Sequence, residues 1–451
     1  MPTIHAATAL LTTGLADNVR VALVQGRIAT IDVGVQAQPG DERIGLLLPG
    51  MASLHSHAFQ RCMAGLAEMR GSIDDSFWTW RETMYRFALA VTPDQLEAVA
   101  AQLYVEMLES GFTRVGEFHY LHHDHNGRPY DDIAEMAGRI CAAAATTGIG
   151  MTLLPTFYAH STFGGAPPIL GQRRFINDLD SYGRLHEGCR RHAATLDNAI
   201  VGVAPHSLRA VTPTQLAAIT ALAPGKPLHI HAAEQTQEIA DCIAWSGKRP
   251  VEWLLDNAGI DERWCIIHAT HMTDSETQRL AASRAVAGVC PITEANLGDG
   301  IFSGRAYLAA GGHIGIGTDS NVLIGVADEI RQLEYSQRLH ERARNVLSNG
   351  TGSTGQALFE AVRKGGARAL GIDTTGIDAG AAADLVAIDL SHAAFAAAPS
   401  AQLLDAWIFA SRGAIDRVWV GGRKLVDGGR HIHHDAVEAR FGRVMKELRT
   451  K

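Results

Sequence analysis

The chain reads Pro49-Gly-Met-Ala-Ser-Leu-His-Ser-His57 near its N-terminal end, an apolar run that closes in His-x-His. Successive side chains of a β-strand point to opposite faces, so His55 and His57 share one face while Ser56 points away. Two imidazoles on one strand face can bind a single metal ion, and zinc prefers nitrogen ligands of this type. A lone His-x-His pair is weak evidence, because such pairs also occur on surfaces and in packed cores.

Three further polar side chains close short apolar runs in the same way. They are His231 in Pro227-Leu-His-Ile-His-Ala-Ala-Glu234, His268 in Cys265-Ile-Ile-His268, and Asp319 in Ile314-Gly-Ile-Gly-Thr-Asp319. Four apolar runs that each end in a polar side chain are hard to explain by core packing. Catalytic and ligand-binding residues of parallel α/β folds, by contrast, lie at the carboxyl ends of the strands. The pattern predicts one metal site built from strands far apart in the sequence.

Composition and charge favour an ordinary globular protein. The chain has 451 residues, 46% of them hydrophobic and 20% charged, which is enough for one large domain and a smaller one. A net charge of −8 argues against a nucleic-acid partner or an anionic membrane surface, because both require a basic footprint. The cysteines lack C-x-x-C spacing, which argues against a disulfide framework or a cysteine zinc site. With no leader pattern and no apolar run of membrane-spanning length, we expect a cytoplasmic protein without membrane contact.

Short apolar runs alternate with helical patterns from about residue 46 to residue 372. Eight of these runs read as buried strands: Leu46–Leu54, Thr113–Phe118, Gly150–Leu154, Ile200–Ala204, Pro227–Ile230, Cys265–Ile267, Ala285–Val289 and His313–Gly317. Helix signals lie between them at Thr92-Pro93, Thr212-Pro213, Thr273–Glu276 and Ala357–Ala369. Strands that alternate with helices form parallel βα units, and eight units predict a closed (β/α)8 TIM-like barrel, with an open doubly wound sheet as the alternative. The barrel is favoured because it brings the polar strand ends to one rim.

The two ends of the chain have short alternating runs that are typical of β-hairpins. These runs are Val19–Val24, Arg27–Ile31, Asp384–Ile388 and Ile415–Val420. We therefore expect residues 1–48 and 376–451 to build one small β-sandwich domain from both chain ends. Residues 49–375 would then form the barrel, which carries the metal-dependent hydrolase chemistry.

Two other histidine groups could bind metal in principle. The first is His119, His122, His123 and His125, and the second is His431, His433 and His434. Neither group is placed at the ends of regularly spaced apolar strands, as the histidines and the aspartate of the predicted metal site are. We interpret most of the first group as a loop around Tyr120, and the second group as solvated.

The set His55-x-His57, His231 with Glu234 three residues on, His268 and Asp319 resembles the amidohydrolase superfamily across almost the whole chain. One branch of that superfamily holds two metals bridged by a carboxylated lysine at the end of the fourth strand, but the segment Ala199–His206 contains no lysine. The His-x-x-Glu element is typical of the other branch, the mononuclear deaminases. The resemblance therefore implies one Zn²⁺ per chain, bound by His55, His57, His231 and Asp319. It also implies that Glu234, His268 and Asp319 handle protons.

Four segments narrow the resemblance to the formimidoylglutamate deiminase family: Gly116–His123, Pro205–Arg209, His231–Thr236 and Pro291–Gly300. Enzymes of this family act in histidine degradation and hydrolyse N-formimidoyl-L-glutamate, a dicarboxylate amidine, to N-formyl-L-glutamate and ammonia. The family also suggests a homodimer. Its substrate-binding residues match Gln60, Arg81, Tyr120, His206 and Arg209.

The residue types also suit the hydrolysis of a dicarboxylate amidine when the family resemblance is set aside. An unreactive amidine carbon needs a nucleophile and a proton for its leaving nitrogen, and Glu234 lies on the same loop as a ligand, where it can carry that proton. The two carboxylates of the substrate require local cations, and arginine meets a carboxylate with a planar bidentate fork.

Simpler readings and other functions stay open. Asp319 could cap a turn, Glu234 could be a helix-start carboxylate, Arg209 could form a surface salt bridge, and Tyr120 could be a packed aromatic. A second enzymatic function is deamination of a nucleobase or another cyclic amidine with the same zinc site. Paired arginines argue against an uncharged base. The remaining interpretation is a noncatalytic scaffold that has kept the barrel fold but no longer catalyses a reaction.

Overall fold

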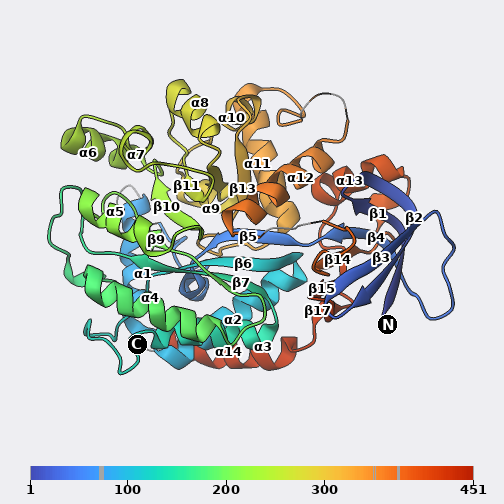
Figure 1. The fold of residues 1–451 in the computed structure, drawn as a ribbon, viewed down its shortest axis with the longest axis horizontal. Coiled ribbons are helices and arrows are strands. Elements are labelled where there is room, and N and C mark those ends of the chain that lie inside the picture. The colour runs from blue at the N-terminus through green and yellow to red at the C-terminus, as the bar shows by residue number, and fades with distance from the viewer. Residues whose placement is uncertain (1, 71–75, 349, 351, 373–375, 450–451) are drawn as a thin grey trace.

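The computed structural model describes residues 2–70, 76–348, 350, 352–372 and 376–449. The central strands are β5 (Met51–Ser56), β6 (Phe112–His119), β7 (Gly150–Phe157), β8 (Ile200–Val201), β9 (Ala204–Pro205), β10 (Leu228–Ala232), β11 (Trp264–His268), β12 (Val286–Val289) and β13 (His313–Ile316). They form two parallel sheets, β5-β6-β7-β8 with β9 beside β7, and β10-β11-β12-β13 (Figure 1). Isolated parallel bridges link the two sheets at both sides, Val203 with Leu228 and Ser56 with Asp319.

The predicted strands are present, with two of the runs divided. The first run, Leu46–Leu54, is divided at Gly50, and its first part belongs to β4 (Glu42–Pro49) of a different sheet. A Cβ atom on Gly50 would lie 2.2 Å from Oγ1 of Thr113, so only glycine allows the chain to pass this point. The fourth run, Ile200–Ala204, is likewise divided into the short strands β8 and β9.

Helices follow most of the central strands along the chain. Their bounds are α1 (Phe77–Ala90), α2 (Pro93–Glu109), α3 (Glu135–Thr147), α4 (Leu179–Ala193), α5 (Pro213–Leu222), α6 (Thr236–Ser246), α7 (Pro250–Asn257), α8 (Asp274–Ala282), α9 (Pro291–Leu297), α10 (Gly304–Ala309), α11 (Val326–Glu341), α12 (Thr354–Ala369), α13 (Leu403–Ala410) and α14 (His434–Arg449). Thr92, Thr212 and Thr273 cap α2, α5 and α8 with capping boxes, which confirms the three predicted starts. The helix predicted at Ala357 begins earlier because Ser353 caps it. Within the described ranges, no helix combines the length and apolarity needed to cross a membrane.

The two chain ends meet in one sheet. Its strands are β1 (Thr3–Leu11), β2 (Gly14–Val24), β3 (Arg27–Val33), β4, β14 (Leu385–Ile388), β15 (Ile415–Val420), β16 (Arg423–Asp427) and β17 (Arg430–His431). The sheet order is β17-β16-β15-β14-β4-β1-β2-β3. The prediction of a sandwich is therefore replaced by one continuous eight-stranded sheet. The reason is β4, which pairs in parallel with β1 and antiparallel with β14 and so joins the strands from both ends.

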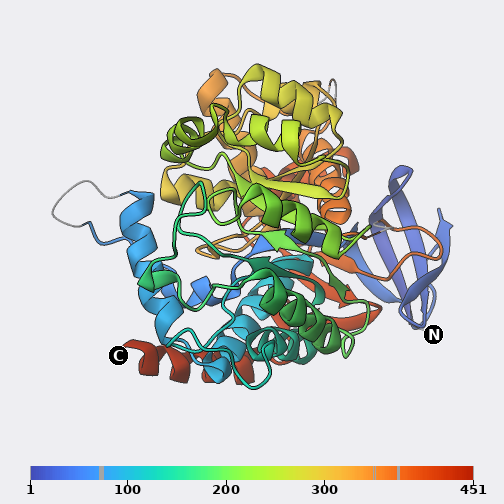
Figure 2. The same cartoon turned by 60° about the vertical axis from the view of Figure 1, so that its left-hand side comes forward.

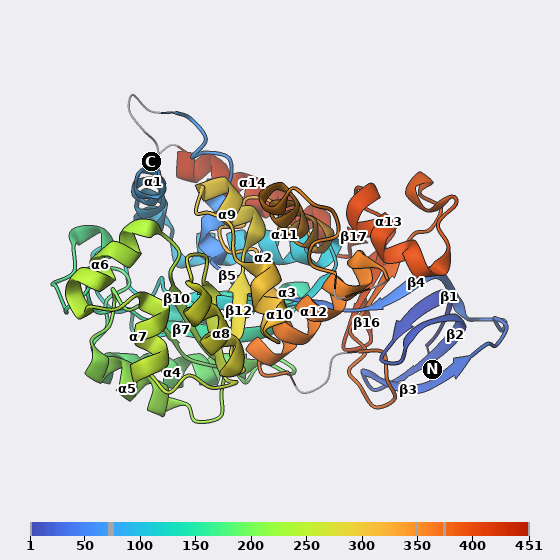
Figure 3. The ribbon, with the colours of Figure 1, turned by 90° about the horizontal axis from the view of Figure 1, so that it is seen from above.

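The terminal sheet lies at one end of the molecule and α1 lies at the other (Figures 2 and 3). Since β5 continues directly from β4 of the terminal sheet, the central parallel strands run away from that sheet. Their carboxyl ends therefore face the end of the molecule where α1 lies.

The last helix, α14, packs along α2 beneath the β5–β8 sheet (Figure 1). This arrangement corrects the interpretation of the C-terminal histidines as solvated for His431 and His434, whereas His433 is exposed as expected. His431 is 3% exposed, and its Nε2 donates to the carbonyl oxygen of Thr147 at 2.9 Å. His434 pairs with Glu109 through Nδ1 and Oε1 at 2.6 Å. The error arose because the docking of this segment on α2 and α3 is a long-range contact.

Helix α12 approaches β13 so closely that a methyl group at Gly365 has no room. A Cβ atom there would lie 1.8 Å from the carbonyl oxygen of Ile314. We expect Gly365→Ala to destabilise the protein by about 3 kcal/mol, because a backbone clash cannot be relieved by rotating a side chain. The change should lower the denaturation midpoint in a thermal or urea melt.

Gly183 in α4 is the matched control, since a Cβ atom there would meet nothing within 4 Å. Gly183→Ala should be neutral or stabilise the protein by up to about 1 kcal/mol through helix propensity. Equal stability of the two variants would mean that α12 can move away from β13.

Candidate metal and substrate site

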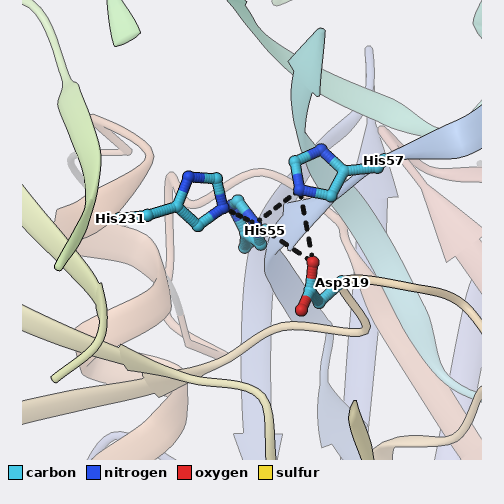
Figure 4. Close-up of side chains that lie close together, drawn as sticks. All are labelled: His55, His57, His231 and Asp319. Carbon is cyan, nitrogen blue, oxygen red and sulfur yellow. Dashed lines mark hydrogen bonds and ion pairs between the residues drawn. The ribbon is translucent and has the colours of Figure 1, made fainter. Parts of the chain in front are cut away.

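Three histidines and one aspartate converge where β5, β10 and the segment after β13 end (Figure 4). The Nε2 atom of His55 lies 3.2 Å from Nε2 of His57 and 3.1 Å from Nε2 of His231. Oδ1 of Asp319 lies 3.3 Å from Nε2 of both His55 and His57. All four side chains are buried. The structure thus brings the predicted set together.

The hydrogen bonds of the outer ring nitrogens indicate what this group can hold. Nδ1 of His57 donates to the carbonyl oxygen of Phe118, and Nδ1 of His231 donates to that of His206, each at 2.9 Å. A carbonyl oxygen only accepts, so Nδ1 carries the hydrogen and Nε2 presents a lone pair. Burial lowers the pKa of His57 and His231, which keeps both rings neutral. Lone pairs and a carboxylate that face one another fit a divalent cation such as zinc.

A polar clasp holds β5 against the segment after β13. Nδ2 of Asn321 donates to the carbonyl oxygens of His57 at 3.0 Å and Asp319 at 2.9 Å. The backbone N–H of Thr318 donates to Oγ of Ser53 at 3.1 Å. Asp319 and Asn321 have φ angles of 44° and 57°, a left-handed conformation that few side chains adopt. The sequence analysis did not identify this clasp, which unites two of the ligand-bearing segments.

Glu234 and His268 lie beside the metal-binding group. Nε2 of His268 is 3.6 Å from Oε1 of Glu234 and 3.8 Å from Oδ2 of Asp319. Burial raises the pKa of Glu234 to about 7, although His268 and Arg209 oppose this shift. Burial lowers the pKa of His268, but the surrounding carboxylates outweigh burial and raise it to about 10. A carboxyl group with a pKa near neutrality therefore lies beside a histidine whose pKa is raised well above neutrality, in one buried place.

A cavity opens beside these side chains. Every residue predicted to bind substrate lines it: Gln60, Arg81, Tyr120, His206 and Arg209. So do Glu234, His268 and Asp319. Residues separated by about 260 positions in the chain therefore border the same space.

The two arginines approach the cavity from different elements. Arg209 follows β9 and is 8% exposed, with Nη2 4.0 Å from Oε2 of Glu234, so the reading of Arg209 as a surface ion pair is wrong. Arg81 lies on α1, and its guanidinium sits 4.8 Å from the ring centre of Trp78 and 5.4 Å from that of Tyr85. Both guanidinium groups can therefore meet anionic parts of a ligand in the cavity.

Gln60, Tyr120 and His206 form a polar wall. Nε2 of Gln60 donates to the hydroxyl of Tyr120 at 2.9 Å. Oε1 of Gln60 is buried and has no hydrogen-bond partner among the described residues. Burial lowers the pKa of His206 well below its usual value, so this ring is neutral. Behind this wall, His122 and His123 are buried and donate to backbone carbonyl oxygens.

The aromatic side of the cavity was missed by the sequence analysis. Its members are Phe77, Trp80, Tyr85, Tyr158 and Phe175. The first three lie on α1, a helix that the sequence analysis did not predict. The signal was available, because Phe77, Arg81, Met84 and Tyr85 recur at the spacing of one helix face.

Comparison with known protein families gives a direct match. The model of the Amidohydrolase family matches residues 46–425. The chain belongs to the amidohydrolase family. In this amidohydrolase, residues 1–45 also match the model described as "Formimidoylglutamate deiminase HutF, N-terminal domain".

Individual relatives cover between 85% and 99% of the amidohydrolase. It is 48% identical to the formimidoylglutamate deiminase of Pseudomonas aeruginosa, over 99% of this chain and 100% of that protein. It is 28% identical to an 8-oxoguanine deaminase of the same organism, over 89% of this chain and 88% of that protein. A 5-methylthioadenosine/S-adenosylhomocysteine deaminase of Natronomonas pharaonis is also 28% identical, over 85% of this chain and 81% of that protein.

Solved structures agree on the fold of this amidohydrolase. An amidohydrolase from Brucella melitensis is 58% identical, with a TM-score of 0.97 over 99% of this chain and 100% of that one. An adenosine deaminase from Xanthomonas campestris, solved with bound zinc, is 23% identical, with a TM-score of 0.81 over 100% of this chain and 98% of that one. The second likeness concerns the fold alone.

Proposed function

We propose that this amidohydrolase is a formimidoylglutamate deiminase, which hydrolyses N-formimidoyl-L-glutamate to N-formyl-L-glutamate and ammonia in histidine degradation. One structural observation carries the proposal: Arg81 and Arg209 line the same cavity as the His55–His57–His231–Asp319 group. A dicarboxylate amidine needs both features, cations for its carboxylates and a metal group for its hydrolysis. The relative that is 48% identical over its full length supports the same activity.

We infer that one zinc ion per chain is held by His55, His57, His231 and Asp319. Nitrogen and carboxylate ligands in a buried group of four support this assignment. When bound, the metal supplies Lewis-acid chemistry that makes water nucleophilic near neutral pH.

In this proposal the proton transfers belong to the chain. Glu234 takes a proton from the attacking water and delivers it to the terminal nitrogen of the amidine. Asp319 takes the second proton of the attacking oxygen, and this proton also passes to the terminal nitrogen. The bond between carbon and that nitrogen then breaks, ammonia leaves, and the remaining N–H and C=O form the formyl amide. The pKa of Glu234 near 7, raised by burial, suits a group that both accepts and donates at neutral pH. His268 and Asp319 hold the attacking oxygen.

Substrate recognition is assigned to the other wall of the cavity. Arg209 and Arg81 pair with the carboxylates, because a guanidinium in a partly dry cavity binds a carboxylate with two charge-assisted hydrogen bonds. Gln60, Tyr120 and His206 orient the formimidoyl-amino part. The open acceptor Oε1 of Gln60 supports a role for this residue toward an N–H group of the substrate.

The closure of the barrel, the division into domains and the oligomeric state belong to the same proposal. We infer that the two parallel sheets act as one closed (β/α)8 barrel within residues 49–375, because parallel bridges link their edges at both sides. Residues 1–48 and 376–451 would form the second domain. The family resemblance supports a homodimer, which light scattering of purified protein would test.

Deamination of a nucleobase is the competing function. Several relatives that are 26–29% identical carry the names of nucleoside or nucleobase deaminases. An uncharged base would offer neither arginine a carboxylate, and the charge-assisted hydrogen bonds of the diacid would be lost. The test is an ammonia-release assay on N-formimidoyl-L-glutamate beside guanine and adenosine. A preference for a nucleobase would reject the proposal and leave only a metal-dependent deaminase.

The Arg209→Met variant tests the carboxylate pocket directly. A charge-assisted hydrogen bond contributes about 1.5–3 kcal/mol, and an unpaired buried charge costs more. We expect kcat/KM on the diacid to fall by roughly 100-fold or more, with unchanged metal content. Arg191→Met is the control, because the Arg191 side chain is 62% exposed and does not line the cavity. Normal turnover of the Arg209 variant would mean that the carboxylates bind elsewhere.

A further inference from the structure

A buried carboxylate lies on the side of His268 that faces away from the cavity. Glu294 is in α9, which follows β12 directly, and it is 4% exposed. Its Oε1 atom accepts the backbone N–H of Cys290 at 2.8 Å and lies 3.3 Å from Nδ1 of His268. Glu294 does not line the cavity, so it meets the proposed substrate only through His268.

The His268 ring bridges two environments. Its Nδ1 atom faces Glu294, while its Nε2 atom lies 3.6 Å from Oε1 of Glu234 and 3.8 Å from Oδ2 of Asp319. The residue is 1% exposed and has a φ angle of 68°, so the backbone that carries the ring is in an uncommon conformation. Such a backbone conformation persists only where the surrounding contacts hold it.

The hydrogen bond to Glu294 also decides which ring nitrogen faces the reacting groups. A carboxylate accepts, so Nδ1 of His268 carries a hydrogen and Nε2 is the atom presented to the reacting groups. In histidine-dependent enzymes a carboxylate behind the ring fixes the tautomer and orientation, and its loss reduces turnover even though it does not touch substrate.

We propose that Glu294 is a positioning residue of the deiminase reaction, which holds the His268 ring and presents its Nε2 atom toward Glu234 and Asp319. This inference rests on the proposed function for its kinetic effect, but not for its geometry. It also gives a role to the Pro291–Gly300 motif, because Glu294 is the carboxylate of that motif that contacts His268.

The first experiment separates a role through His268 from support of the fold. Glu294→Ala should lower kcat by roughly 10- to 100-fold and leave metal content and KM within about twofold of wild type. Glu294→Gln keeps an acceptor oxygen and should recover part of that loss. The matched control is Glu329→Gln, because Oε2 of Glu329 also supports α9, through Ile292 N–H at 3.0 Å, without a contact to His268. This control should stay within about twofold of wild-type kcat.

A double-mutant cycle with His268→Asn completes the kinetic test. If Glu294 acts through His268, then adding Glu294→Ala to His268→Asn should change kcat little. An equal further loss in that background, or a comparable loss in Glu329→Gln, would mean general support of α9 and would overturn the proposal.

A spectroscopic readout is independent of turnover. The buried Nδ1–H between His268 and Glu294 should give a downfield proton resonance in wild type and in Glu329→Gln. That resonance should disappear in both Glu294→Ala and His268→Asn. A spectrum without it in wild type, or one that keeps it in Glu294→Ala, would contradict the pairing. If wild type failed to hydrolyse N-formimidoyl-L-glutamate while the resonance behaved as expected, the proposed function would fail and the positioning role would stand.

Discussion

Glu234→Gln should lower kcat on N-formimidoyl-L-glutamate by roughly 10²- to 10⁴-fold, while metal content and substrate affinity stay near wild type. The exchange preserves the size of the side chain and one acceptor oxygen, but it removes the group that carries the proton. Glu234 is buried beside His268 and Arg209, and burial raises its pKa to about 7. A glutamine cannot cycle between protonated and ionised forms there. Steady-state kinetics and metal analysis would measure the change.

Glu238→Gln is a demanding control for this variant. Glu238 is 1% exposed and accepts the backbone N–H of Glu234 at 3.0 Å, so it shapes the same loop without facing the cavity. We expect less than a tenfold loss of kcat from this control. Comparable losses in the two variants would assign the effect to loop geometry. Near-normal kcat in Glu234→Gln would move the proton-transfer role to His268.

His231→Ala should remove both the metal and the activity. The Nε2 atom of His231 lies 3.1 Å from Nε2 of His55, and His231 comes from a different strand than the His55–His57 pair. Without His231, β10 supplies no ligand to the metal. Mutation of residues that only hydrogen-bond to metal ligands already lowers metal affinity by about 10- to 100-fold, so loss of a ligand itself should lower it far more. Elemental analysis after dialysis should give about one equivalent for wild type and close to none for the variant.

His229→Ala is the matched control for the metal prediction. His229 precedes His231 by two residues on β10 and donates through Nε2 to the carbonyl oxygen of Ala369 at 2.7 Å, away from the metal-binding group. This variant should keep its metal, although the lost hydrogen bond lowers stability. Two equivalents of metal in active wild type would contradict the mononuclear proposal. The second ion would then be sought at His268, Cys290 and Glu294, whose ligand atoms also lie close together.

The sequence by itself determined the strands and the residues that end them. Strand identity depends on local periodicity, and a side chain that closes a buried parallel strand points to the same edge as its counterparts on neighbouring strands. For this reason His55, His231, His268 and Asp319 could be placed together before any contact was known. The capping boxes at Thr92, Thr212 and Thr273 were equally readable, since a cap involves residues only three positions apart.

Tertiary structure alone decided the parts that depend on long-range contacts. The continuous terminal sheet requires the pairing of β4 with β1 and β14, and neither partner is marked in the local sequence. His431 is buried because its segment docks against Thr147 at the end of α3, 284 residues earlier in the chain. Glu294 is one carboxylate among many until α9 places it 3.3 Å behind His268. Periodicity shows which face of an element is buried, but the partner on that face depends on how distant elements pack.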